Sequence, residues 1–217
     1  MTWIRNNYEI ILQAFTSHLW LAIPAIAATL IISVPVAKLA ITHPRIREVT
    51  LTSTGLLYAI PSLPLFIFIP LIFGIPLRSP TNVHIVLTVY GCALMVRATA
   101  DALGSVNADL LDAATASGYS NTRRFFMVQL PLAGPAILAG LRVVAVSTIS
   151  LTTVSAVLGI KSLGTLFTDG FQRGIVVEVL AGIILTTLLA FVIDALLVVL
   201  GRIIMPFQKH LTAEGKK

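Results

Sequence analysis

The sequence has few charged residues and almost no cysteine. Only 11% of its 217 residues are Asp, Glu, Lys or Arg, against about 25% in average soluble proteins. The single cysteine, Cys92, stands in an apolar run, which excludes an intrachain disulfide and a CxxC metal pair. The sequence contains no GxxxxGK[ST] phosphate loop, HExxH zinc motif or GxSxG nucleophile motif. We therefore expect no enzyme activity, no metal and no cofactor bound by this chain.

Long apolar runs dominate the sequence instead. Hydrophobic residues make up 57% of it, and the mean hydropathy is +0.95. A helix needs ~20 mostly apolar residues to cross the hydrocarbon core, and it satisfies its own backbone there. The sequence thus predicts an all-α, polytopic membrane bundle. Five runs are expected to cross the membrane: 18–40, 51–75, 83–100, 135–159 and 175–204.

Prolines interrupt the first two of these runs. Pro24 and Pro35 lie in the first, where neighbouring helices can satisfy the carbonyls that a proline frees. Pro61, Pro64 and Pro70 lie in the second, which makes a straight helix improbable there. We predict a kinked second span that faces the interior of the bundle.

The basic residues predict the orientation of the chain. A net charge of +6 is compatible with nucleic-acid binding, but Lys and Arg gather at the ends of the apolar runs, as the positive-inside rule requires. We therefore expect no nucleic acid, an external N-terminus and a cytoplasmic C-terminus. Residues 1–17 are expected to form an interfacial amphipathic segment or a frayed end, 18–206 the transmembrane domain and 207–217 a cytoplasmic tail. The expected cytoplasmic residues are Lys38, Arg45, Arg47, Arg97, Arg123, Arg124, Arg202, Lys209, Lys216 and Lys217.

One polar interval, 107–131, separates the third and fourth apolar runs. Asn107 is a good N-cap, and Asp109 and Asp112 suit the positive end of a helix dipole. Gly118 can end this helix in the left-handed conformation, and a second helix is expected to run on until Pro131 closes it. The interval thus predicts a cytoplasmic helix-turn-helix. A solvated loop is the alternative, and a DNA-reading motif is disfavoured between membrane spans.

The sequence Asp112-Ala113-Ala114, followed by Gly118 and then Leu130-Pro131, resembles the EAA loop of ABC-importer permeases. It departs from that pattern in having Asp112 where glutamate is commoner, which shortens the reach of the carboxylate. The resemblance implies that the interval couples the permease to an ATPase. The coupling residues it implies are Asp109, Asp112, Ala113, Ala114, Gly118, Arg123, Arg124, Leu130 and Pro131.

Three further stretches resemble permeases of the osmoprotectant branch of type I ABC importers: 60–63, 130–142 and 193–194. This resemblance implies import of glycine betaine, choline or carnitine across a bacterial or archaeal cytoplasmic membrane. It implies as partners an ATPase dimer carrying ATP and Mg²⁺, a second copy or a sister permease, and an external binding protein. A methionine-type importer permease and a membrane scaffold without transport are the alternatives.

Hydroxyl groups, an aromatic ring and the proline kink suggest a route for the solute. Freed carbonyls need a cavity, a tyrosine offers a π face to a quaternary ammonium, and hydroxyls can meet a carboxylate. Close packing of small residues is the alternative for the serines and threonine. The predicted pathway residues are Pro61, Ser62, Tyr90, Ser147, Ser150 and Thr153.

Two charged residues fall inside the predicted spans. Arg142 is expected to have a structural role, either by snorkelling to the interface or by binding helix carbonyls. Asp194 is a functional candidate unless it pairs with Arg142 or Arg202. The four histidines are dispersed, and we expect them at interfaces or in solvent. They are His18, His43, His84 and His210.

Overall fold

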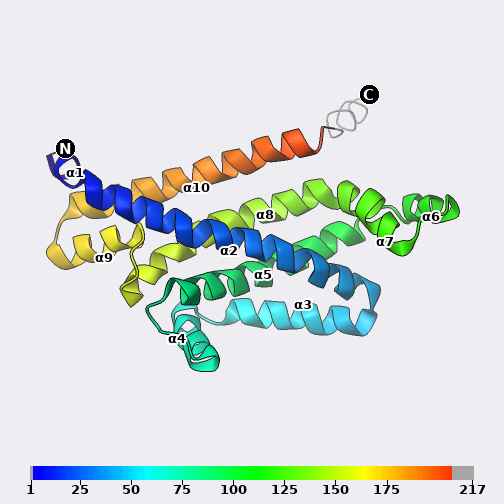
Figure 1. Ribbon diagram of the computed structural model, residues 1–217, viewed down its shortest axis with the longest axis horizontal. Coiled ribbons are helices and arrows are strands. Elements are labelled where there is room, and N and C mark those ends of the chain that lie inside the picture. The colour runs from blue at the N-terminus through cyan, green and yellow to red at the C-terminus, as the bar shows by residue number, and fades with distance from the viewer. Residues whose placement is uncertain (1, 207–217) are drawn as a thin grey trace.

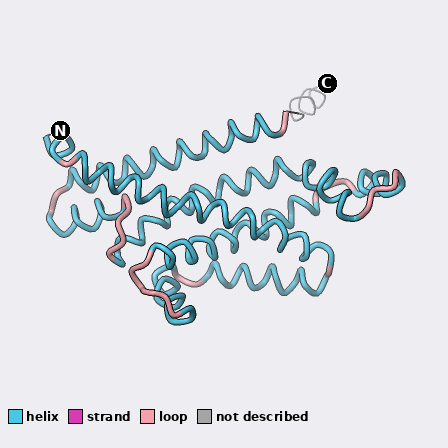
Figure 2. The backbone as a smooth tube through the Cα atoms, in the orientation of Figure 1, coloured by secondary structure: helices cyan, strands magenta, loops and turns pink. Residues whose placement is uncertain are grey.

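The computed structural model describes residues 2–206, which form helices joined by turns, with no strand among them (Figures 1 and 2). The predicted cytoplasmic tail, 207–217, lies outside the described residues. The elements are α1 Thr2–Asn6, α2 Tyr8–Thr42, α3 Pro44–Ala59, α4 Ser62–Phe73, α5 Pro80–Gly104, α6 Ala108–Ala116, α7 Asn121–Arg124, the π-helical turn η1 Phe125–Gln129, α8 Leu130–Thr152, the 3₁₀ turn η2 Thr153–Leu158, α9 Gly164–Arg173 and α10 Val176–Ile204.

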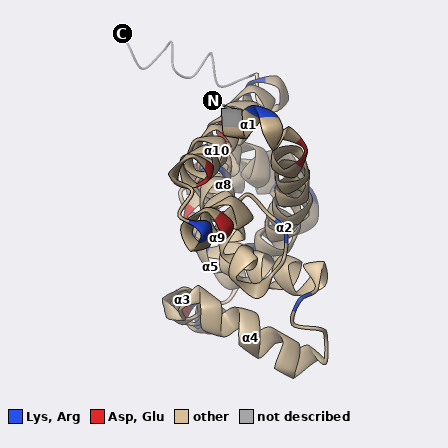
Figure 3. Cartoon of the chain, turned by 90° about the vertical axis from the view of Figure 1, so that its left-hand side faces the viewer, with Lys and Arg blue, Asp and Glu red and all other residues tan. Residues whose placement is uncertain are grey.

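Four helical stretches within residues 2–206 are long and apolar enough to cross a membrane. They are Tyr8–Thr42, Pro80–Gly104, Asn121–Leu158 and Val176–Ile204. The bent pair of α3 and α4 makes a fifth if it counts as one span. The predicted all-α bundle is confirmed. Figure 3 looks at it from the end that carries the N-terminus and shows mostly uncharged helix surface.

Successive spans run in alternating directions along the bundle (Figure 1). The N-terminus and α9 lie at one end, whereas the α2–α3 turn, α6, α7 and the last turn of α10 lie at the other. The helix-turn-helix interval and the end of the described chain are therefore on the same side of the molecule. Which side faces the cytoplasm remains a prediction from the basic residues.

The first span is longer than the sequence predicted. Helix α2 runs without a break from Tyr8 to Thr42, so no boundary separates the N-terminal segment from the span at residue 17. Pro24 and Pro35 both lie inside this helix. The interfacial position of residues 1–17 stays a prediction.

The second span is broken more sharply than a kink. Helix α3 ends at Ala59, and Ile60 and Pro61 are extended, with ψ of 127° and 142°. The residue before a proline avoids the helical region, and Pro61 cannot donate to the preceding turn. The axes of α3 and α4 consequently differ by 112°.

A buried asparagine stabilises the second half of this span. Pro70 lies inside α4 and has no N–H for the carbonyl of Phe66, four residues earlier. Asn82 of α5 is fully buried, and its Nδ2 donates to the Phe66 oxygen and to the Leu77 oxygen, at 3.0 Å each. The carbonyl that Pro70 frees is thus satisfied by a neighbouring helix, as predicted for prolines in such a bundle.

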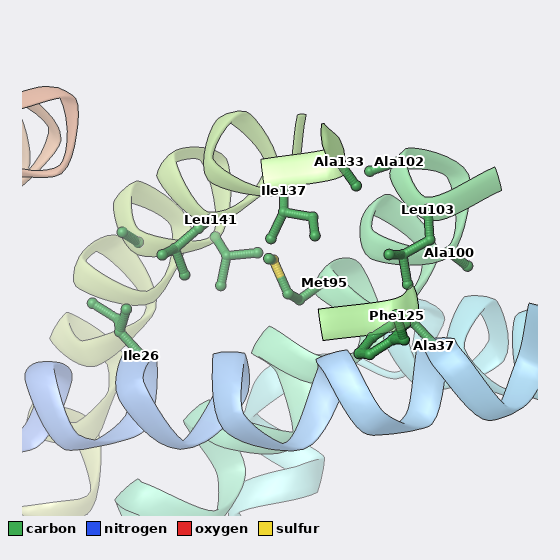
Figure 4. Close-up of a cluster of buried hydrophobic side chains, with 12 residues drawn as sticks. Ile26, Ala37, Met95, Ala100, Ala102, Leu103, Phe125, Ala133, Ile137 and Leu141 are labelled. Carbon is green, nitrogen blue, oxygen red and sulfur yellow. The ribbon is translucent and has the colours of Figure 1, made fainter. Parts of the chain in front are cut away.

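A hydrophobic cluster joins α2, α5 and α8 near the end that carries α6 and α7 (Figure 4). Met95 and Leu103 of α5, Ala37 of α2 and Ile137 of α8 are among its buried members. Small residues elsewhere bring the same helices close, because a Cβ on Gly91 of α5 would overlap the Thr29 hydroxyl of α2. Helix α5 is thereby the central element of the bundle.

His18 is buried, not solvated, which corrects the expectation for this residue. Its Nδ1 accepts from the Leu163 N–H at 3.3 Å, so Nε2 carries the proton and donates to the Ile149 carbonyl at 3.1 Å. The imidazole therefore ties α2 to α8 and to the turn before α9. Two buried backbone groups depend on this one side chain.

Candidate coupling surface and translocation cavity

The turn between α6 and α7 has the geometry predicted for Gly118. Its φ is +83°, in the left-handed region. The Gly118 N–H donates to the Thr115 carbonyl at 3.0 Å, and the Tyr119 N–H donates to the Ala114 carbonyl at 3.1 Å. This pair of bonds is a Schellman motif, which satisfies the last carbonyls of α6 and reverses the chain.

Side chains fix both helices of this interval. Asn107 Oδ1 accepts from the Asp109 N–H at 2.9 Å, which caps α6, and Ser120 Oγ accepts from the Arg123 N–H at 3.3 Å, which caps α7. A bond of 2.8 Å from Arg124 Nη1 to Thr115 Oγ1 then joins the two helices. We call residues 107–124 the coupling knob.

The coupling knob presents an uncovered surface. No side chain of α6 or α7 is buried. Asp109, Asp112 and Ala113 are exposed, Ala114 is half-buried, and Leu110 keeps 50% of its surface exposed. Leu110 and the neighbouring alanines leave apolar surface uncovered, rimmed by the carboxylates of Asp109 and Asp112, as at protein interaction sites.

The second helix does not end at Pro131, contrary to the prediction. Residues from Asn121 to Leu158 form one continuous helical stretch. Within it, the Leu130 N–H donates five residues back, to the Phe125 carbonyl, in the π-helical turn. Because this turn already shifts the hydrogen-bond ladder, the missing N–H of Pro131 falls where the α-helical pattern is interrupted. The fourth span is therefore a direct extension of the knob.

The base of the knob is packed into the bundle. Phe125 is 3% exposed and belongs to the cluster with Ala37 and Leu103 (Figure 4). The Lys38 ammonium lies 4.1 Å from the centroid of the Phe125 ring, and Gln129 Nε2 donates to the Leu103 carbonyl at 3.2 Å. A displacement of the knob would consequently be transmitted to α2, α5 and α8 together.

A cavity of about 650 Å³ opens between the α3–α4 break, α5 and α8. Its volume lies within the ~300–1,000 Å³ range of small-molecule sites. All six predicted pathway residues line it: Pro61, Ser62, Tyr90, Ser147, Ser150 and Thr153. The structure thus brings together residues from Pro61 to Thr153, which are 92 positions apart in the sequence.

Two tyrosines form one wall of the cavity. The Tyr90 hydroxyl donates to the carbonyl of Ile60, which lies in the extended break between α3 and α4. Its ring stands 6.1 Å from that of Tyr58, at an interplanar angle of 72°. Tyr90 is only 9% exposed, whereas Tyr58 is 51% exposed. The aromatic surface open to a solute therefore belongs mainly to Tyr58, which the sequence analysis did not select.

The opposite wall carries hydroxyl groups of α8 and η2. Thr153 donates its hydroxyl proton to the Ser150 carbonyl at 2.7 Å, so this hydroxyl can only accept from a solute. Ser150 is exposed and Ser147 is half-buried. The cavity lining contains no Asp, Glu, Lys or Arg within the described chain.

The two predicted intramembrane charges pair with each other. Arg142 Nε and Nη2 donate to the two carboxylate oxygens of Asp194 at 2.6 and 2.7 Å. Their side chains are 41% and 27% exposed. The fork geometry matches both carboxylate oxygens, and neutralising each charge lowers its cost inside a membrane. Of the two partners considered for Asp194, the structure selects Arg142 over Arg202.

Comparison with known proteins agrees with this architecture. Residues 42–206 match the family described as binding-protein-dependent transport system inner membrane component. The osmoprotectant import permease protein OsmW of Salmonella typhimurium is 33% identical over 187 residues, which cover 83% of this chain and 85% of OsmW. The glycine betaine/carnitine/choline transport system permease protein OpuCD of Bacillus subtilis is 27% identical over 210 residues, 96% of this chain and 90% of OpuCD.

A solved structure supports the fold. A structure of the MetNI methionine ABC transporter in an inward-facing conformation superposes with a TM-score of 0.81. The match covers 91% of this chain and 97% of that chain, at 18% sequence identity. At that sequence identity, the similarity establishes the fold of this chain but does not indicate its substrate. The extent of the family match, with the exposed knob and the transmembrane cavity, shows that the chain belongs to the inner membrane components of binding-protein-dependent transport systems, as a permease of an ABC importer.

Proposed function

We propose that the chain carries a quaternary-ammonium or zwitterionic osmoprotectant, such as glycine betaine, choline or carnitine, into the cell. The observation that supports this proposal is the uncharged cavity, which is lined by the exposed aromatic residue Tyr58 and by the hydroxyls of Ser147 and Ser150. A quaternary ammonium has no N–H to donate, so an aromatic face and apolar walls can bind it without a carboxylate. A primary ammonium, as in methionine, needs acceptors for three N–H groups.

The names of the relatives support the same substrate class. OsmW is named for osmoprotectant import, and OpuCD for glycine betaine, carnitine and choline. Family membership also favours transport over a scaffold without transport.

The coupling knob is proposed to dock on a cytoplasmic ATPase dimer that holds ATP and Mg²⁺. Its uncovered surface at Asp109, Asp112 and Leu110 supports this proposal. ATP-driven closure of the ATPases would displace the knob, and the continuous helix from Asn121 to Leu158 would pass that displacement to the cavity. A second copy or a sister permease, and an external binding protein that delivers the solute, complete the proposed importer.

The proposed location is the cytoplasmic membrane of a bacterium or archaeon, with lipid around the bundle. The family description places its members in the inner membrane. Arg45 and Arg47 lie in α3 at the α2–α3 turn, on the same end as the knob in Figure 1, which supports a cytoplasmic position for that end.

The experiment is to purify the native complex from membranes and to identify the solute released on denaturation. The same complex, with its ATPase and binding protein, is then reconstituted into vesicles and offered radiolabelled glycine betaine, choline or methionine. ATP-dependent uptake of glycine betaine or choline, and none of methionine, is expected. Uptake of methionine alone would replace the proposed substrate class, and no ATPase in the purified complex would contradict the proposed coupling.

A further inference from the structure

The cavity offers one exposed aromatic ring. Tyr58 is the next-to-last residue of α3; it lines the cavity, and half of its surface is exposed. Tyr90 is almost entirely buried, and its hydroxyl is bonded to the Ile60 carbonyl. A solute in the cavity can therefore reach the ring of Tyr58 far more readily than that of Tyr90.

The position of the Tyr58 ring is fixed by its neighbours. The edge-to-face contact with Tyr90, 6.1 Å between centroids, is a favourable aromatic geometry. The bond from Tyr90 to Ile60 anchors the chain two residues after Tyr58, in the extended break where the Ile60 carbonyl lies outside both helices. A ring held in this way can bind a ligand without first being ordered.

The chemistry of the cavity lining indicates which chemical group of a solute the Tyr58 ring would bind. The lining contains no carboxylate, and a quaternary ammonium has no N–H with which to bond the hydroxyl and carbonyl oxygens, so the faces of aromatic rings are a favourable surface for it. The hydroxyls of Ser147 and Ser150 line the same cavity from a different element, α8, and can donate to a carboxylate. A zwitterion with a trimethylammonium group at one end and a carboxylate at the other matches this arrangement.

We infer that the ring of Tyr58 is the cation-binding element of the translocation cavity, and that Tyr90 is a positioning residue that holds it. This inference rests on the proposed function, because it names the group of the osmoprotectant that the cavity recognises. It makes Tyr58 a determinant of specificity within the permease, in addition to any selection by the binding protein.

The test replaces Tyr58 by phenylalanine and then by phenylalanines with one, two and three ring fluorines. Fluorination weakens the negative potential of the ring face while it changes the shape little, so it separates cation binding from packing. Uptake of glycine betaine is measured in vesicles that contain the complete importer, at a concentration that saturates the binding protein. The same series at Phe68, exposed on α4 and outside the cavity lining, is the matched control.

Uptake is expected to fall stepwise along the Tyr58 series, by roughly 2- to 30-fold in total, and to stay constant along the Phe68 series. A constant rate along the Tyr58 series, or equal losses in both series, would overturn the inference while leaving the proposed function intact. If the unmodified importer takes up neither glycine betaine nor choline, the proposed substrate class fails instead.

The positioning role of Tyr90 has its own readout. Tyr90→Phe removes the bond to the Ile60 carbonyl and is expected to flatten the fluorine dependence at position 58. A fluorine dependence unchanged by Tyr90→Phe would show that Tyr90 does not position the ring.

Discussion

The Nε2 atom of His84 lies 3.0 Å from the carbonyl oxygen of Trp20, the residue four positions before Pro24. Pro24 cannot donate to that carbonyl, so the imidazole N–H replaces the missing backbone donor. His84 therefore has a structural role although it is only half-buried, and its expected position at the interface stays a prediction. Asn82 does the same for the Phe66 carbonyl that Pro70 frees, and Tyr90 donates to the Ile60 carbonyl in the break between α3 and α4. All three side chains come from α5, so one helix stabilises the proline-containing segments around it.

Whether Asn82 replaces the backbone donor that Pro70 removes can be tested with a double-mutant cycle. Asn82→Ala leaves the Phe66 and Leu77 carbonyls without their donor and is expected to lower the free energy of unfolding by about 1–3 kcal/mol. Pro70→Ala restores a backbone N–H for Phe66, so the double variant should recover part of the loss. Thermal unfolding of the detergent-solubilised protein measures both.

Pro35→Ala is the matched control, because Pro35 lies in α2 and frees a carbonyl that Asn82 does not bond. It should not rescue Asn82→Ala. Equal recovery with Pro35→Ala and Pro70→Ala would mean that removing any proline stabilises the chain, and that Asn82 has no specific link to Phe66.

The prolines and apolar runs were sufficient to predict much of this fold. A run of ~20 apolar residues has few stable alternatives to a membrane helix, and a proline that follows a residue such as Ile60 forces extended backbone there. Gly118 was similarly predictable, because the left-handed turn after a helix strongly favours glycine. These features depend on local chemistry, so the sequence alone determines them.

The features that sequence reasoning missed depend on what lies across the bundle. Pro131 reads locally as a helix end, yet packing of Phe125 into the core and the π-helical turn keep the helix continuous. Tyr58 and Tyr90 are the same residue type, but Tyr90 belongs to a buried cluster on the central helix α5, whereas Tyr58 is exposed near the end of α3. Such choices are made by tertiary contacts, which have no signature in sequence spacing.

The left-handed turn of the coupling knob predicts that substitutions at Gly118 impair transport by different amounts. A Cβ there would meet nothing within 4 Å, so any effect comes from the positive φ and not from a clash. Asn tolerates this conformation, Ala costs about 1–2 kcal/mol and β-branched Val more. Uptake and ATPase stimulation are therefore expected to fall in the order Asn, Ala, Val at equal expression. Vesicle uptake and phosphate release provide the measurement.

Gly104→Val controls for the change of side chain. Gly104 lies at the end of α5, also with open space around it, but its φ is not positive. This variant should be milder than Gly118→Val. If Gly118→Val retained full uptake and full ATPase stimulation, the knob would not be the coupling element.

The orientation of the chain predicts the side from which cysteines are labelled. In a Cys92→Ala background, a cysteine replacing Ser120 of the knob should react only from the cytoplasmic side. One replacing Phe171, which is 85% exposed on α9, should react only from outside. Leu166→Cys is the control for burial, because Leu166 is 1% exposed on the same helix and should react from neither side. The opposite pattern for Ser120 and Phe171 would invert the proposed orientation.

The cavity itself predicts the effect of filling it. Ser150 is exposed and lines the cavity, so the indole of Ser150→Trp would project into the space between α8 and the α3–α4 break. Uptake should be abolished, while assembly with the ATPase and basal ATP hydrolysis persist, because the knob and its base at Phe125 are unchanged. Leu188→Trp, at an exposed position of α10 outside the cavity lining, should transport normally. Normal uptake by a fully assembled Ser150→Trp importer, together with normal uptake by Tyr90→Ala, would place the route elsewhere and leave Ser147, Ser150 and Thr153 as packing residues.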